Sequence, residues 1–257
     1  MTASTTTPIR AAGAPQSGRV LALTAAELRL LLRNRTVAVS ALVVPLMFGL
    51  LFALISPDGD ALVDGSVAAR QLVIVLGMSV YVTATQTVVS RRHARVLKRF
   101  RTSALSDTGL LVAVLAPAVV IGLGQLVVIA VIDVLSGFSA PVAPLALLAA
   151  VAGGLLLCVP AALATSAVTP SPERAQITTL PLTFVLLAAG VVVPLLPPDG
   201  PLQLLLAVPG SAIGALATTA FTGQMWGSPL FSVAALLVWP AVFAWLAARR
   251  FRWDARN

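Results

Sequence analysis

Side chains that could perform catalysis are few in this sequence. The one histidine, His93, lies in a run of arginines, so histidines cannot gather around a metal ion. The one cysteine, Cys158, lies in an apolar run where packing is its expected role, and no Cys-x-x-Cys redox pair exists. The hydrolase motifs Gly-x-Ser-x-Gly and His-Glu-x-x-His are absent. We therefore expect no catalytic residue, metal or cofactor in this chain.

A phosphate-binding loop is missing as well. The one lysine, Lys98, follows Leu97, so the motif Gly-x-x-x-x-Gly-Lys-[Ser/Thr] cannot form around it. If the protein uses ATP, a separate subunit must bind it.

The composition indicates that lipid surrounds much of the chain. Hydrophobic residues make up 58% and charged residues 10%, and the mean hydropathy is +0.99. A soluble domain carries roughly a quarter charged residues. The net charge of +8 comes from basic residues beside apolar segments, which favours contact with anionic lipid over nucleic-acid binding.

The sequence predicts an all-α polytopic membrane protein whose membrane domain covers residues 37–248. A helix of about 20 apolar residues crosses the ~30 Å hydrocarbon core of a bilayer. Six segments meet this length, at about 37–55, 71–90, 110–135, 145–168, 177–196 and 229–248. Basic residues gather on one side of these spans and only Arg70 lies on the other, which predicts cytoplasmic N- and C-termini.

Three further segments flank the spans. Residues 1–18 are rich in Thr, Ala, Gly and Pro and predict a disordered cytoplasmic tail, and residues 249–257 predict a basic cytoplasmic tail. Residues 19–36 predict an amphipathic helix lying in the membrane interface. The charged residues of that helix are Glu27, Arg29, Arg33 and Arg35.

A few polar residues lie inside the predicted spans. Gln86, Gln125 and Thr183 are candidates for a substrate path, although hydrogen bonds between helices are the simpler interpretation of both glutamines. Asp133 falls near the outer end of its span, so we expect a structural or interfacial role for it. Small residues in spans four and five favour close helix packing, either within the chain or in a dimer.

Three stretches carry a family resemblance. They are residues 26–52 (AELRLLLRNRTVAVSALVVPLMFGLLF), residues 91–106 (RRHARVLKRFRTSALS) and residues 205–223 (LLAVPGSAIGALATTAFTG). Their order and the spacing of the spans resemble the permease subunits of type 2 ABC transporters, which have the type V exporter fold. That family includes drug-resistance permeases of the daunorubicin type and exporters of polysaccharides and lipids.

The second stretch is similar to the family's cytoplasmic signature, often close to E-R-E-x-G-x-L-x-R-L-R-x-T-P-L. The positions that keep the signature are Arg92, Leu97, Arg99, Arg101 and Leu105. The positions that depart from it are Arg91, His93, Arg95 and Ala104.

The resemblance implies a coupling helix between spans two and three that docks on an ATPase subunit. It also implies a re-entrant helical hairpin on the outer side, between spans five and six. The implied docking residues are Arg92, Arg95, Val96, Leu97, Arg99, Phe100 and Arg101. A basic anchor that sets topology and has no partner is the alternative interpretation.

The leading hypothesis is therefore the permease subunit of an ATP-driven exporter in a bacterial cell membrane. Its expected partners are an ABC ATPase subunit, membrane lipid and a second permease, which is either another copy or a homologue. The expected substrate is an amphipathic drug-like or lipid-like molecule. The alternatives are a membrane-anchored enzyme or scaffold, and an ion-driven secondary transporter, which would need linked carboxylates within the membrane.

Overall fold

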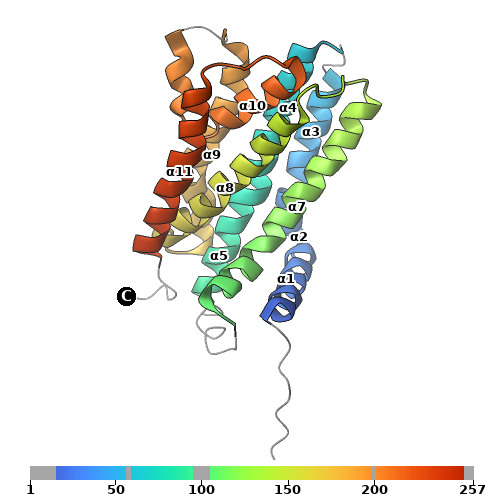
Figure 1. Cartoon of the computed structure of the whole chain (residues 1–257). Helices are drawn as coiled ribbons and strands as arrows, with labels where there is room; N and C mark the ends of the chain where they lie inside the picture. The colour runs from blue at the N-terminus through green and yellow to red at the C-terminus, as the bar shows by residue number, and fades with distance from the viewer. Residues whose placement is uncertain (1–15, 56–58, 95–104, 198–200, 252–257) are drawn as a thin grey trace, which may run out of the picture.

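The computed structural model describes residues 16–55, 59–94, 105–197 and 201–251 of the chain. Over these ranges the predicted all-α fold is confirmed, because they contain helices and no β-strand (Figure 1). Five of the described helices are long and apolar enough to cross a membrane. They are Ala61–His93, α7 (Asp107–Leu135), α8 (Pro144–Val168), α9 (Pro172–Val192) and α11 (Pro229–Arg250).

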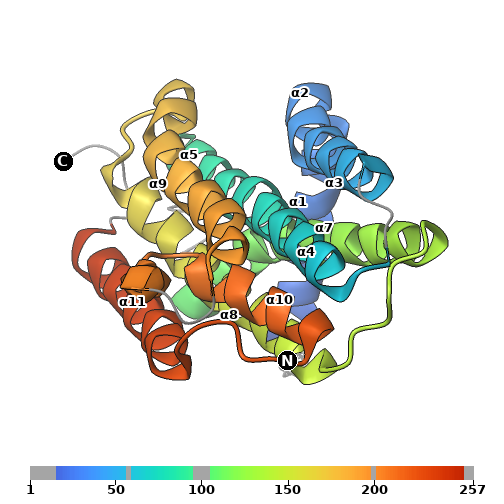
Figure 2. The same ribbon diagram turned by 90° about the horizontal axis from the view of Figure 1, so that it is seen from above.

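The first of these five is the central helix of the molecule. It joins α4 (Ala61–Ile74), the π-helical segment η2 (Val75–Val82) and α5 (Thr83–His93) into one rod. In its most apolar stretch 78% of the residues are buried, against 17% in α11. Figure 2 shows α9 on one side of this rod and α3 on the other.

A further helix corresponds to the first predicted span, 37–55. It runs without a break through α2 (Arg35–Ala38), the π-helical segment η1 (Val39–Val43) and α3 (Val44–Ile55). At 1.5 Å per residue its length is about 30 Å, and it lies against the central helix and α7.

The start of the central helix differs from the prediction. The sequence predicts a polar break at residues 56–65 and a span that begins near residue 71. In the structure the helix already begins at Ala61. Asp60 caps it, accepting hydrogen bonds from the backbone N–H groups of Leu62 and Val63 at 2.8 and 3.1 Å. Acidic residues at a helix N-terminus satisfy the N–H groups that lack a partner within the helix, so these residues start a helix instead of breaking one.

The segment between α9 and α11 is also mostly helical. It contains the short 3₁₀ helices η3 (Val193–Leu195) and η4 (Pro201–Ala207), followed by α10 (Ser211–Thr222), which is about 18 Å long and too short to cross a membrane. Nearly all of α10 is buried against α4 and α8. Gly65 of α4 permits this, because a Cβ atom there would lie 3.0 Å from the Cα atom of Thr218.

The two ends of the bundle differ in charge. We call the end that carries α1 (Gln16–Arg33), the C-terminus of α5 and the C-terminus of α11 the basic end (Figure 1). The other end, with the start of α4, the loop 136–143 and the C-terminus of α10, is the opposite end. Residues 16–18, predicted within the tail, are the first turn of α1, and Arg249 and Arg250 end α11. Residues 1–15 and 252–257 lie outside the described residues.

Candidate functional site

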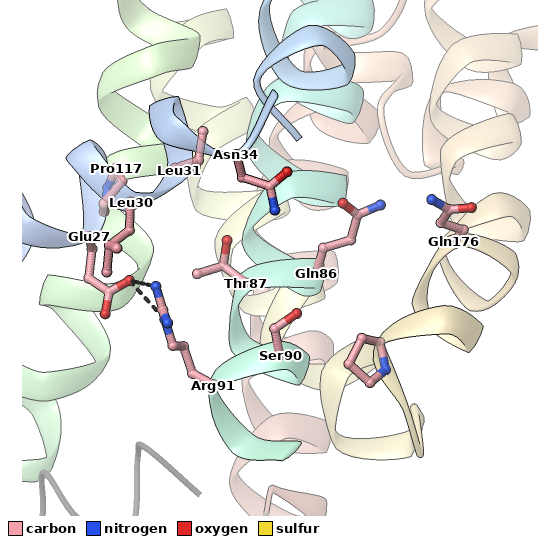
Figure 3. Close-up of a pocket in the computed structure, with 11 residues that line it drawn as sticks. Glu27, Leu30, Leu31, Asn34, Gln86, Thr87, Ser90, Arg91, Pro117 and Gln176 are labelled. Atoms are coloured by element: carbon pink, nitrogen blue, oxygen red, sulfur yellow. Dashed lines mark hydrogen bonds and ion pairs between the residues drawn. The ribbon is translucent and has the colours of Figure 1, made fainter. Parts of the chain in front are cut away.

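A polar cavity opens at the basic end, between α1, α5, α7 and α9. It has a volume of about 300 Å³. Gln86 of α5 and Gln176 of α9 point toward one another across it (Figure 3). The other polar residues of its wall are Glu27, Asn34, Thr87, Ser90 and Arg91.

One wall of this cavity is held by an ion pair. Arg91, at the end of α5, donates through Nε to Glu27 Oε2 at 2.9 Å, and its second terminal nitrogen lies 2.7 Å from the same oxygen (Figure 3). The Glu27 side chain is 4% exposed and that of Arg91 26% exposed. The pair ties α1 to the end of the central helix just before residues 95–104. Because the carboxylate is engaged by a guanidinium, it is poorly suited to act as a general base.

A second cavity continues the first toward the middle of the bundle. It has a volume of about 240 Å³ and lies between η2, α5 and α9. Gln86 and Gln176 line both cavities, and Thr179 and Thr183 extend the wall one and two helical turns along α9. Together the two cavities form what we call the α5–α9 groove, which runs from the basic end into the bundle.

The wall of the groove presents hydrogen-bonding groups among apolar side chains. Thr183 donates its hydroxyl proton to the carbonyl of Thr179 at 2.9 Å, and Thr179 donates likewise to Ala175 at 2.9 Å. Their hydroxyl oxygens keep lone pairs as acceptors. Gln86 has no side-chain hydrogen bond to another residue among those that the structure describes. The groove can therefore hold the polar part of an amphipathic molecule. Among the described residues, no group of His, Cys, Asp and Glu could hold a metal ion.

Gln125, the third residue predicted for the substrate path, lies elsewhere. Its side chain is 2% exposed and joins three helices, donating to the carbonyls of Ala41 and Leu42 at 2.8 and 3.0 Å and accepting from Ser79. Ala41 and Leu42 belong to η1 and Ser79 belongs to η2. Gln125 thus bridges two π-helical segments, which often occur at functional positions.

The predicted docking residues are mostly outside the described part. Residues 95–104 are not described, so Arg95, Val96, Leu97, Arg99, Phe100 and Arg101 remain predictions. The side chain of Arg92 is described and is 4% exposed. It donates a hydrogen bond to the carbonyl of Thr169, the residue that ends α8. A cation is favourable there because the helix dipole places partial negative charge at a C-terminus. Arg92 therefore positions the end of α5 and is withdrawn from the surface.

The charged residues of the predicted interfacial helix divide into two groups. Glu27 is buried against the central helix, whereas Arg29 and Arg33 of α1 are exposed. Arg35 is exposed as well and lies beyond a break in the helix at Asn34, where α2 begins. The buried side of α1 packs on α7.

Two residues that line the groove were not predicted from the sequence. Gln176 directly precedes the predicted span 177–196, and Asn34 lies within the predicted interfacial helix 19–36. A signal was present for Gln176, because Thr179 and Thr183 follow it at the spacing of one helical face. No comparable signal marks Asn34, which reaches the groove through the packing of α1 on its neighbours.

The fold and the cavities define a multi-pass helical membrane protein with a partly polar groove between two of its long apolar helices. A family model described as ABC-2 family transporter protein matches residues 60–249. The chain therefore belongs to the ABC-2 transporter family, which confirms the resemblance found in the sequence. Among curated proteins, none matches the chain. Membrane components of this family are typically non-catalytic transport subunits and work with ATPase subunits.

Proposed function

We propose that this chain is the membrane-spanning subunit of an ATP-driven exporter of amphipathic, drug-like or lipid-like molecules. A separate ABC ATPase subunit binds and hydrolyses ATP. A second permease, either another copy or a homologue, completes the complex. In this proposal the chain catalyses no reaction itself and needs no cofactor of its own.

The α5–α9 groove is the observation that carries this proposal. It combines amide and hydroxyl groups with apolar walls, and it extends inward from the basic end. Such a lining suits a molecule with a polar head and an apolar body, because the head keeps its hydrogen bonds while the body avoids water. Substrate enters near Gln86 and Gln176 and moves along α9 past Thr183.

The orientation in the membrane is inferred from the charges, and the outward direction of transport from the resemblance to exporters. From the positive-inside rule we infer that the basic end faces the cytoplasm of a bacterial cell, with both termini on that side. The continuous helix Arg35–Ile55 then serves as a sixth span beside the five long ones. The segment 197–228, with α10, covers the outer exit as a re-entrant lid, as in the type V exporter fold.

The segment 91–106 transmits the ATPase movement to the groove. Residues 95–101 dock on the ATPase. The ion pair of Arg91 with Glu27, and the bond of Arg92 to α8, connect that segment to three helices. A push on the segment therefore changes the spacing of α1, α5 and α8 together.

The experiment is co-purification with an ABC ATPase from the same genome. Leu97→Asp and Phe100→Asp should each abolish association with the ATPase and substrate-stimulated ATP hydrolysis, because each places a charge on an apolar docking surface. Val142→Asp is the matched control, since Val142 is exposed in the loop at the opposite end. Full association by both docking variants would refute the docking assignment.

A further inference from the structure

A separate cavity lies at the opposite end, away from the α5–α9 groove. It has a volume of about 240 Å³ and lies between α4, α7, the loop after α7, α8 and α10. It shares no residue with either cavity of the groove. Its wall is almost entirely apolar, with Leu126, Ile129, Leu147, Val151 and Phe221 among its residues.

One carboxylate stands in this apolar wall. The Asp133 side chain is 9% exposed, and its Oδ1 accepts a hydrogen bond from Gln71 Nε2 at 2.9 Å. The same nitrogen donates to the carbonyl of Gly49 at 3.1 Å, so the carboxylate is held in place by α4 and α3. The cavity is therefore largely apolar, with one carboxylate on its wall that α3 and α4 hold in position.

A second carboxylate lies close behind this wall. Asp64 is fully buried, and its Oδ2 accepts from the backbone and hydroxyl of Ser139, a residue of the cavity wall, at 2.8 and 2.7 Å. Its Oδ1 is buried without a hydrogen-bond partner. The two carboxylates interact electrostatically with one another.

No cation balances this negative charge among the residues that the structure describes. The ion pair of Glu27 with Arg91 lies at the basic end, away from both carboxylates. Arg70, the basic residue nearest in the chain to Asp64, lies over the ring of Phe52 with its guanidinium carbon 5.9 Å from the ring centre. A buried carboxylate without a counter-charge is costly, and a bound cation would lower that cost.

We propose that this cavity binds a hydrophobic monocation, an apolar body with an ammonium group that faces Asp133. The apolar wall supplies the affinity for the body, and the carboxylate supplies the preference for positive charge. The site does not depend on ATP, on a partner subunit or on the groove, so it stands apart from the proposed transport function.

The test uses the purified full chain and radiolabelled phenyltrimethylammonium in equilibrium dialysis. This probe is small enough for the cavity and permanently charged. Benzenesulfonate, of similar size and opposite charge, is the comparison probe. We expect saturable binding of the cation and no saturable binding of the anion.

Two variants locate the site. Asp133→Asn keeps an acceptor for Gln71 but removes the charge, and should weaken cation binding at least about tenfold, roughly 1.4 kcal/mol. Ala130→Phe fills the cavity while keeping the carboxylate, and should abolish binding. Asp60→Asn is the control, because Asp60 is an exposed acid at the same end.

Each outcome decides the proposal. Loss of cation binding in Asp133→Asn and Ala130→Phe, with Asp60→Asn unchanged, supports it. Equal binding of the cation by the wild type and Ala130→Phe overturns it, as does equal binding of cation and anion. If Asp133→Asn fails to fold, the result with Ala130→Phe decides alone.

Discussion

The polar residues in the two halves of the central helix have different surroundings. In the half toward the opposite end, Gln71 is bonded to Asp133 and to the backbone of α3, and α10 covers the helix. In the half toward the basic end, Gln86 faces two cavities and has no such bond among the described residues.

The difference shows how one helix can be a fixed support along one half and line a groove along the other. Bonded polar groups and close glycine packing hold the α4 half to α3, α9 and α10. The α5 half packs on α7, α8 and α9 and is also fixed at its end by Arg91 and Arg92, but it leaves space for two cavities along α9. We expect stability to depend on the first half and transport on the second.

A substitution that disturbs the close packing of α9 against the α4 half should have the largest effect on stability. A Cβ atom on Gly190 would lie 2.4 Å from Cγ2 and 2.7 Å from Cβ of Val73. Gly190→Ala should therefore destabilise the protein by about 1–3 kcal/mol through overpacking. Thermal unfolding in detergent measures it. Gly124→Ala is the control, because a Cβ there meets nothing within 4 Å, and equal melting of both variants would contradict the packing model.

The ion pair at the basic end should contribute less. Glu27→Gln removes the charge that holds Arg91, whose partial exposure to water screens the pair, so we expect a loss of about 1 kcal/mol. The double variant Glu27→Arg with Arg91→Glu should regain part of this loss, as measured by chemical unfolding. A double variant no more stable than either single one would show that the pair is not what joins α1 to α5.

The bridge between the two π-helical segments should contribute at least as much as the ion pair. Gln125→Leu removes the hydrogen bonds to Ala41, Leu42 and Ser79. Polar bonds within membranes average about 0.6 kcal/mol each, so losing three of them should cost about 1.8 kcal/mol and lower the melting temperature. Gln224→Leu, in an exposed loop, is the control and should leave the melting temperature unchanged.

The groove itself should affect stability least and transport most. Gln86→Leu removes no side-chain hydrogen bond found among the described residues, so stability should stay within about 0.5 kcal/mol of the wild type. Export from inverted vesicles with the ATPase subunit should slow, because the polar part of the substrate loses a partner. Normal export by this variant would show that the substrate does not depend on the groove.

Much of the fold could be predicted, and less of the site. The apolar runs were correctly predicted as helices. Asp60 and Asp64 lay outside the predicted spans, although Asp60 caps the central helix and Asp64 lies in its first turn. Gln86 and Thr183 were predicted for a path and do line one groove. Gln125 carries the same side chain as Gln86 and is enclosed by carbonyl groups, a difference that no local pattern records.

The sequence by itself determined the membrane character, the apolar segments and the charge difference between the ends. These follow from the cost of placing charge in hydrocarbon, which acts on each segment separately. Only the tertiary structure decided which polar groups meet. The spans are apolar on nearly every side, so periodicity marks no inner face. The position of Gln86 opposite Gln176 in the groove, and the hydrogen bond of Gln71 to Asp133, depend on how the helices are rotated and packed.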